Sequence, residues 1–421
     1  MKTSRIQGFY KLSVEERLKI VKEFANLSDE EVDILYKKGI SVEQANHMIE
    51  NVIGIIGIPL GIATNFLING KDYLIPMAIE EPSVVAAASN AARMAREKGG
   101  FKASSTDSVM IGQIQITDLK DIKKAEKDII SQKNKILEVA NSKDPVLVKF
   151  GGGATDIRIR VIKAKKEEML IVHLLVDVRD AMGANAVNTM SEAVAPILEE
   201  ISKGKVYLRI ISNLSTERLA RAEAIFSKEA LGGTEIVDGI IKAYEFADLD
   251  QYRACTHNKG IMNGITAVGL ATGNDTRAIE AGAHSYAAIS GKYRSLTKWE
   301  KTKDNDLKGS IEIPIAVGII GGATKIHPVA KIALKILNVN SAKELSEIMA
   351  AVGLAQNLAA MRALVAEGIQ RGHMRLHARN IAVTAGAVGD QIEKVAEMMA
   401  NENNIRLERA KEIINELNEV K

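Results

Sequence analysis

The chain has 421 residues, more than one ordinary hydrophobic core holds, so roughly two or three domains are expected. Its 56 lysines and arginines nearly balance its 53 aspartates and glutamates, and the net charge of +3 is too small to favour a nucleic acid or a membrane surface as the partner. A single cysteine, Cys255, excludes an internal disulfide framework and fits a reducing compartment.

Three signatures of helix starts stand near the N-terminus. In each, a serine is followed three positions later by Glu or Gln, which caps a helix reciprocally. The pairs are Ser13 with Glu16, Ser28 with Glu31, and Ser41 with Gln44. No apolar run resembles a secretory signal, and the apolar stretch 52–68 is interrupted by glycine and proline and is shorter than the roughly 20 residues of a spanning helix. We expect a cytoplasmic protein without a membrane partner.

Residues 52–80 are expected to be extended, and Pro82 to begin an Ala-rich helix that runs to Arg96. From about residue 108 the pattern predicts a unit in which strands and helices alternate. Its expected strands are 110–116, 146–150, 157–162, 169–178 and 205–211, and its expected helices are 119–140 and a long one from Asn185. This succession resembles the split βαβ arrangement of ferredoxin-like type.

Ala- and Gly-rich helical sequence returns after about residue 218, with expected helices at 261–271 and 276–289 and another capped by Ser341 and Glu344. Two amphipathic helices, 387–401 and 404–420, predict a small mobile unit at the C-terminus. We therefore expect an α+β fold, in which a large, mostly helical domain carries an inserted ferredoxin-like domain and a C-terminal flap. The expected boundaries are 1–107 and 219–370 for the large domain, 108–218 for the inserted domain, and 371–421 for the flap.

Lys259 and Asp275 are the first candidates for chemistry, because they are expected on two successive turns bounded by glycine. A lysine so placed can stabilise an oxyanion, and an aspartate within reach favours its charged form. Arg253, Asn258 and Asn263 add polar groups around it, a combination suited to binding a carboxylate and a carbonyl together. The alternative is a surface lysine and an aspartate that caps the following helix.

Glu81 and His373 are candidate proton donors. Glu81 precedes a helix N-terminus, where its ordinary role would be to cap the helix. His373 and His377 are four residues apart, which also suits a metal pair on a helix, but no glutamate or cysteine ligands accompany them. A proton-donating histidine is the preferred interpretation, and no metal site is expected. The remaining histidines are expected to be structural: His47, His173, His257, His284 and His327.

For phosphate binding, the glycines at 151–153 lack the GxGxxG pattern of an ordinary Rossmann domain. The turn 180–188 is the better candidate, because Gly183 can bring backbone N–H groups and a helix N-terminus against a pyrophosphate. This signal alone does not identify a cofactor, since any strand-to-helix turn can hold a glycine.

Six motifs in chain order resemble those of the 3-hydroxy-3-methylglutaryl-coenzyme A (HMG-CoA) reductase family, in its soluble class II form. They lie at 50–54, 80–89, 180–185, 256–264, 273–275 and 372–374, and begin with GluAsnValIleGly and end with GlyHisMet. The resemblance covers nearly the whole chain, and six ordered motifs are far more specific than any one of them.

The resemblance implies a four-electron interconversion of HMG-CoA with mevalonate and coenzyme A, using two nicotinamide cofactors in sequence. Lys259 would then stabilise the oxyanions, and Glu81 would donate a proton. Asp275 would hold the charge and geometry of this network, and His373 would protonate the departing thiolate. The implied substrate contacts are Ser83, Arg253, Asn263 and Gln356.

The inserted domain would bind the cofactor, and the implied contacts are Asp180, Met182, Gly183, Asn185 and Asn188. Asp144 matches the acidic residue that NAD-using members place on the ribose 2′-hydroxyl. Its charge would repel a 2′-phosphate, so NAD(H) is expected ahead of NADP(H). Tyr10 and Lys11 stand where the family has an Arg-containing coenzyme A contact. A homodimer with the active site at the subunit interface is also implied, with further assembly and the direction of the reaction left open.

Two other functions are compatible with the same residues. One is a non-redox coenzyme A thioester hydrolase that uses Glu81 and His373. The other is a helical interaction scaffold, in which the Gly-rich turns merely join Ala-rich helices. Consumption of reduced nicotinamide during turnover separates the reductase from the hydrolase, and loss of turnover with retained folding in Lys259→Ala separates it from the scaffold.

Overall fold

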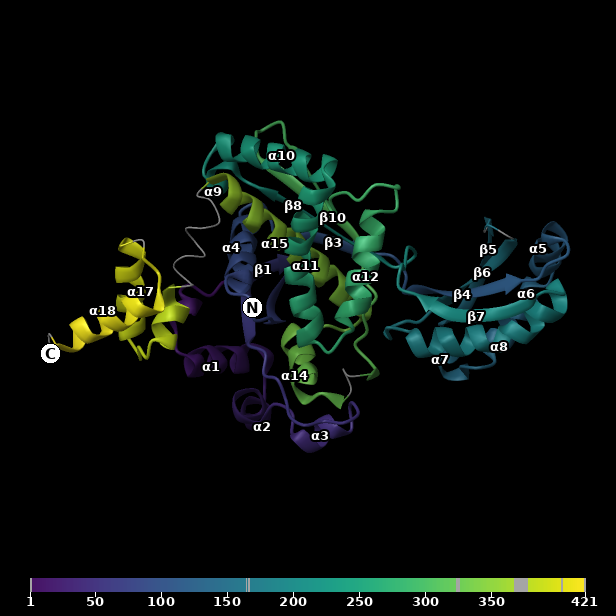
Figure 1. Ribbon diagram of the computed structural model, residues 1–421, viewed down its shortest axis with the longest axis horizontal. Helices are drawn as coiled ribbons and strands as arrows, with labels where there is room; N and C mark the ends of the chain where they lie inside the picture. Colours follow the sequence, from purple (N-terminus) through teal and green to yellow (C-terminus); the bar gives the residue numbers. More distant parts are fainter. Residues whose placement is uncertain are drawn as a thin grey trace.

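The computed structural model describes residues 2–163, 165, 167–322, 326–366, 378–402 and 404–419. These residues form a mixed α+β architecture (Figure 1). The strands are β1 (Leu60–Ile68), β2 (Lys71–Ala78), β3 (Lys102–Ser105), β4 (Val109–Thr117), β5 (Gly153–Lys163), β6 (Glu168–Asp177), β7 (Lys205–Ser212), β8 (Leu219–Phe226), β9 (Thr297–Lys301) and β10 (Leu307–Pro314). The helices are η1 (Phe9–Lys11), α1 (Val14–Ala25), α2 (Asp29–Asp33), η2 (Ile34–Lys38), α3 (Val42–Asn46), α4 (Val84–Arg96), α5 (Ile122–Ser131), α6 (Lys133–Asn141), α7 (Pro145–Lys149), α8 (Ala184–Ser202), α9 (Lys228–Leu231), α10 (Thr234–Leu249), α11 (Gln251–Ala271), α12 (Thr276–Ala287), α14 (Pro328–Leu337), α15 (Ala342–Ala366), α17 (Gln391–Asn401) and α18 (Leu407–Glu419).

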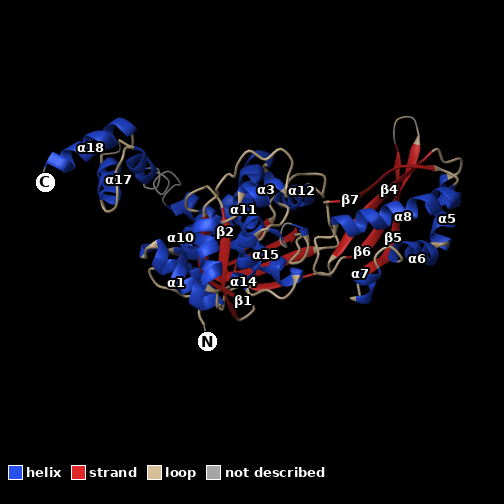
Figure 2. Ribbon diagram, turned by 90° about the horizontal axis from the view of Figure 1, so that it is seen from below, coloured by secondary structure: helices blue, strands red, loops and turns tan. Residues whose placement is uncertain are grey.

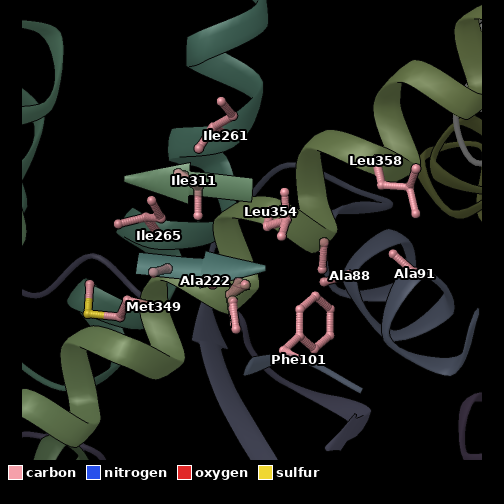
Figure 3. Packing of buried hydrophobic residues seen from close by; sticks show 14 of the residues in the cluster. Ala88, Ala91, Phe101, Ala222, Ile261, Ile265, Ile311, Met349, Leu354 and Leu358 are labelled. Carbon is pink, nitrogen blue, oxygen red and sulfur yellow. The ribbon is translucent and has the colours of Figure 1, made fainter. Parts of the chain in front are cut away.

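The larger core surrounds α15, which packs against α4, α11 and the sheet β3-β8-β10-β9. Figure 3 shows Met349 and Leu354 of α15 beside Ile261 and Ile265 of α11. Gly353 permits this approach, because a Cβ there would lie 2.8 Å from the Ile265 side chain. Among the described residues α15 is the one helix long and apolar enough to cross a membrane, but its most apolar window is 67% buried, as in the core helix of a soluble protein.

A second sheet has the order β5-β6-β4-β7, with antiparallel pairing throughout. Helices α5, α6 and α8 lie along one of its faces (Figure 2). The apolar side chains of these helices pack on those of the sheet and form a second hydrophobic core, which includes Ile114, Val172 and Val194. The order places β4, the first of these strands in the chain, inside the sheet between β6 and β7.

One expected strand of this unit is wrong, because residues 146–150 form the short helix α7 and its C-terminal cap. Pro145 is the first residue of α7, and the Asp144 carboxylate accepts a hydrogen bond from the Leu147 N–H. These two helix-start signals outweigh the β-propensity of the valines. The expected helix 119–140 is also divided, with α5 ending at Ser131 and α6 beginning at Lys133.

The capping signals at the N-terminus are confirmed. Ser13, Ser28 and Ser41 each accept from the N–H three residues later, and the Glu or Gln side chain there accepts from the serine N–H. The start of α4 differs from expectation, because Ser83 is its N-cap and Pro82 precedes it. Helix α11 also begins well before residue 261, since the Asp250 carboxylate caps it by accepting from the Arg253 N–H.

Helices α17 and α18 pack on each other at the C-terminus, around a small cluster that includes Val395, Met399 and Ile413. Figure 1 shows them in yellow at one end of the molecule, opposite the sheet β5-β6-β4-β7. They lie within the two amphipathic helices predicted there, but begin four and three residues later than expected. The predicted sites His373 and His377 lie outside the described residues.

Candidate functional site

An ion pair between Lys259 and Glu81 is the centre of the candidate site. The Lys259 Nζ donates to Glu81 Oε2 at 2.7 Å, although the two residues are 178 positions apart. Lys259 lies in the middle of α11 rather than on the expected glycine-bounded turn, and Glu81 lies in the short turn that leads into α4. The Lys259 side chain is 59% exposed and that of Glu81 34% exposed, so the pair is open to a ligand from solvent.

Asp275 does not pair with Lys259 in this structure. It caps α12, where its Oδ1 accepts from the N–H groups of Arg277 at 3.0 Å and Ala278 at 3.1 Å. The same oxygen lies 3.1 Å from the Arg277 guanidinium. Asp275 is therefore a helix cap in this chain, as the alternative interpretation expects. The carboxylate that pairs with the Lys259 ammonium is that of Glu81, which local spacing did not suggest.

Ser83 adopts an uncommon backbone conformation beside this pair. Its φ is 75°, in the left-handed region that L-residues seldom occupy, and its side chain makes no capping hydrogen bond to α4. Strained residues of this kind cluster at ligand-binding sites. The conformation therefore supports the prediction that Ser83 faces a ligand.

Gln356 of α15 lies against α11 where these two helices pack together. A Cβ at Gly264 would lie 3.1 Å from the Gln356 Cβ, so Gln356 contacts α11 at Gly264, the residue that follows Asn263. The Gln356 Oε1 is buried and has no hydrogen-bond partner among the described residues, so it is an unsatisfied acceptor. Arg253 is half-buried on α11, and this burial lowers its pKa.

A buried polar network beneath α11 was not found by sequence reasoning. The His257 ring contacts the Thr297 hydroxyl at 3.0 Å, the Ser295 hydroxyl at 2.9 Å and the Asn357 amide at 3.1 Å. The neighbouring Asn258 accepts from the Leu296 N–H and donates to a backbone carbonyl. These bonds tie α11 to β9 and α15 directly before Lys259, and they confirm a structural role for His257.

This network makes stability depend on pH. Burial, with a smaller contribution from Arg253, lowers the pKa of His257 to about 3, below the value of about 6.5 in an unfolded chain. The unfolded chain therefore binds an extra proton between about pH 3 and 6.5, and stability falls as the pH falls through this range, by about 1.4 kcal/mol per pH unit. In urea unfolding of the wild type and His257→Asn, the stability difference should shrink by about 2 kcal/mol from pH 6.5 to 5. If the free energies of unfolding of the two proteins changed equally with pH, this prediction would be contradicted.

Residues 178–183 connect β6 to α8, so the predicted segment 180–188 comprises the end of this connection and the first residues of the helix. Gly183 caps α8 with a φ of 100°, and a Cβ there would lie 2.5 Å from the Val178 side chain, so only glycine fits. Asn185 is exposed in the first turn of α8. The carboxylate of Asp180 accepts from the Ala342 N–H at 2.8 Å, and the Asn188 Oδ1 accepts from the Ile211 N–H at 2.9 Å. Two of the predicted cofactor residues thus have structural partners.

A cavity of about 1000 Å³ lies between the N-terminal segment, β1 and α4. Its lining includes Arg5, Tyr10, Arg17 and Arg93. The first residue of α4 that lines the cavity is Val85, four residues after Glu81. Sequence reasoning missed this cavity, because its three arginines are far apart in the chain. No group of three or more metal-ligating side chains is found among the described residues.

Comparison with known proteins gives one family. A model of the family "Hydroxymethylglutaryl-coenzyme A reductase" matches residues 13–378. The 3-hydroxy-3-methylglutaryl-coenzyme A reductase of Archaeoglobus fulgidus is 64% identical over 415 residues, covering 99% of this chain and 95% of the relative. A probable reductase of the same name from Borreliella burgdorferi is 40% identical over 383 residues, covering 89% of this chain and 86% of the relative.

Solved structures agree with these matches. A 3-hydroxy-3-methylglutaryl-coenzyme A reductase from Streptococcus pneumoniae superposes with a TM-score of 0.84 at 40% identity, covering 98% of this chain and 99% of the other. The class II enzyme of that organism, bound to NADPH in open conformations, gives a TM-score of 0.82 at 40% identity, covering 97% and 100%.

Proposed function

Since the chain belongs to the hydroxymethylglutaryl-coenzyme A reductase family, and so has HMG-CoA reductase activity, we propose that the ion pair of Lys259 and Glu81 is its reaction centre. The observation that supports this most is the 2.7 Å contact between an ammonium and a carboxylate that both remain open to solvent. A carbonyl oxygen beside Lys259 would meet a hydrogen-bond donor that is itself bonded to a carboxyl group able to take up and release a proton.

A nicotinamide cofactor would supply hydride when bound. Lys259 would donate a hydrogen bond to the thioester oxygen and stabilise the negative charge that develops on it. In the ion pair Glu81 is ionised and accepts from Lys259, so it would deliver a proton to this oxygen only from its protonated form, which the step returns to the carboxylate. Because the capping bonds of Asp275 use Oδ1, we assign Oδ2 to the same network. We also assign protonation of the departing thiolate to His373, which the described residues do not include.

The acyl end of the substrate would lie between α4, α11 and α15. Arg253 would pair with its free carboxylate, because a partly desolvated guanidinium binds carboxylates in fixed geometry. The Gln356 Oε1 would accept from the substrate hydroxyl, and Ser83 and Asn263 would complete the set.

Stoichiometry tests the reaction. We expect purified protein to oxidise two reduced nicotinamides for each coenzyme A released from HMG-CoA, because a thioester must accept two hydrides to become an alcohol. Thiol titration and nicotinamide absorbance measure the two quantities together. Release of coenzyme A without loss of absorbance would indicate a thioester hydrolase instead.

We place the coenzyme A portion in the cavity beside α4, where three arginines can meet its phosphates. Arg93→Gln should raise the KM for HMG-CoA about tenfold and leave the cofactor KM unchanged, as measured by initial rates. Arg379→Gln is the matched control, since Arg379 is also a helical arginine in surface contacts but lies in the C-terminal unit. Equal effects of the two substitutions would count against this placement.

The sheet β5-β6-β4-β7 would form the inserted cofactor domain, residues 108–218. Its strand order and its helices on one face support the ferredoxin-like interpretation, and its core is largely separate from that around α15. The boundaries 1–107 and 219–370 for the large domain and 371–421 for a flap complete this proposal. The open N-terminus of α8, with Gly183 before it, fits a pyrophosphate.

We favour NAD(H) as the cofactor, although a solved relative is bound to NADPH. Asp144 supports this choice, because its negative charge would repel a 2′-phosphate. Its Oδ1 is held in place by the Leu147 N–H at the start of α7. Asp144→Ala should therefore improve kcat/KM for NADPH relative to NADH, by about tenfold. Asp121→Ala is a matched control, since Asp121 caps α5 through the same type of hydrogen bond. A cofactor ratio that changes equally in both variants would remove the basis for this preference.

A homodimer would cover the segment that leads from α3 to β1. Its isoleucines are unusually exposed for an extended segment, with Ile53 at 103% and Ile56 at 90% of full exposure, and Ile49 is also exposed. Contiguous exposed apolar side chains mark protein interfaces. The segment holds the GluAsnValIleGly motif, and the family resemblance implies an active site at the subunit interface. We place this assembly in the cytoplasm.

A further inference from the structure

Arg218 is a buried arginine directly before β8, and it is 5% exposed. Its guanidinium Nη1 donates to the carbonyls of Ala181 at 3.1 Å and Met182 at 3.2 Å, and its Nη2 donates to the carbonyl of Val317. One planar fork therefore satisfies carbonyls from two separate loops. Burial lowers the pKa of Arg218 to about 10, which leaves it charged at neutral pH.

The segment 317–319 lies directly on the turn 180–182. A Cβ at Gly318 would lie 2.6 Å from the Met182 nitrogen, so any side chain there would push the turn away. The Ile319 N–H donates to the Asp180 carbonyl at 2.9 Å. Together with Arg218, these contacts hold the turn 180–182 from two sides.

The same segment also reaches the catalytic side. The Gly318 N–H donates to the Asn274 Oδ1 at 2.8 Å, and Asn274 directly precedes Asp275. Ala316 belongs to the core of the sheet β5-β6-β4-β7, whereas Val317 belongs to the core around α15. This short piece of chain is therefore shared by the two cores and by both predicted binding turns.

We propose that Arg218 is a positioning residue for the nicotinamide cofactor, which fixes the turn 180–183 against the segment 317–319 and so sets where the cofactor meets the reaction centre. The inference rests on the proposed cofactor site at 180–188. A guanidinium can span three carbonyls in one plane, whereas a lysine ammonium keeps the charge but cannot reach the same set. Small displacements of a bound reactant are costly, since roughly 1 Å can cost about 100-fold in rate.

The substitution Arg218→Lys tests this, because it preserves the charge near the cofactor phosphates. We expect its KM for the reduced cofactor to rise about tenfold and its kcat to fall, with the KM for HMG-CoA within about twofold of wild type. Binding of reduced cofactor without substrate, followed by nicotinamide fluorescence, should weaken to the same extent. Arg221→Lys is the matched control, since Arg221 lies in β8 and pairs with Glu312 at the surface; both constants should stay unchanged.

Unchanged cofactor affinity in Arg218→Lys, or an equal loss of affinity for both ligands, would overturn the inference while the reductase activity of the wild type stands. A wild type that reduces HMG-CoA with neither nicotinamide would reject the proposed function instead. Should Arg218→Lys not fold, Gly318→Ala decides the question, because its added Cβ displaces the Met182 amide without removing a charge. A selective rise in cofactor KM supports the inference, and an equal effect on both ligands overturns it.

Discussion

Lys259→Ala should lower kcat for HMG-CoA reduction by about 10³-fold while the protein stays folded. The ammonium donates directly to Glu81 at the proposed reaction centre, and the loss of one oxyanion donor costs on this order. Folding should be retained, because the side chain is 59% exposed and alanine is favourable in a helix. Turnover is measured by nicotinamide absorbance, and folding by circular dichroism and thermal unfolding.

The matched control for this substitution is Lys335→Ala. Lys335 also lies in a helix, α14, and its ammonium pairs with Glu31 at 2.6 Å on a partly exposed surface. Loss of such a surface pair changes stability by only about 0–1 kcal/mol, so activity should remain. If Lys259→Ala kept more than about a tenth of wild-type turnover, Lys259 would not be the oxyanion donor.

Ile53→Glu combined with Ile56→Glu should convert the protein to a monomer and reduce turnover more than about 100-fold. Burying each isoleucine at an interface contributes roughly 1.5–3 kcal/mol, and the glutamates would add unpaired charge there. Both side chains are fully exposed in a single chain, so the folded monomer should tolerate the change. Light scattering after size exclusion gives the mass, and the reductase assay gives the activity.

Ile130→Glu is the control, because Ile130 is likewise an exposed isoleucine but lies on α5, outside the proposed interface segment. It should change neither the mass nor the turnover. A double variant that remains a fully active dimer would exclude residues 53–56 from the interface.

Local signals in the sequence predicted local structure well. The serines at 13, 28 and 41 cap their helices as expected, because both partners of a capping box lie within four residues. The valine-rich 146–150 segment was misassigned because β-propensity was weighed above the cap of Asp144 and Pro145. The early start of α11 was missed in the same way at Asp250.

Tertiary partners were less predictable. The residue types for carbonyl chemistry were recognisable, but which carboxylate meets Lys259 depends on how α11 packs beside the turn before α4. The hydrogen bonds of His257 and of the Arg218 guanidinium likewise join segments far apart in the chain, so local sequence spacing does not predict them. Motifs identified the chemistry, whereas packing decided its geometry.

The insertion of the sheet β5-β6-β4-β7 between β3 and β8 has a consequence for folding. Strands β3 and β8 pair with each other, and the Thr106 hydroxyl bonds a carbonyl 111 residues further along the chain. Early folding of the inserted unit would bring these strands close together and lower the entropy cost of closing the loop. The large core around α15 would then form late, and a destabilised insert would slow maturation of the whole enzyme even where its own contacts lie far from the substrate.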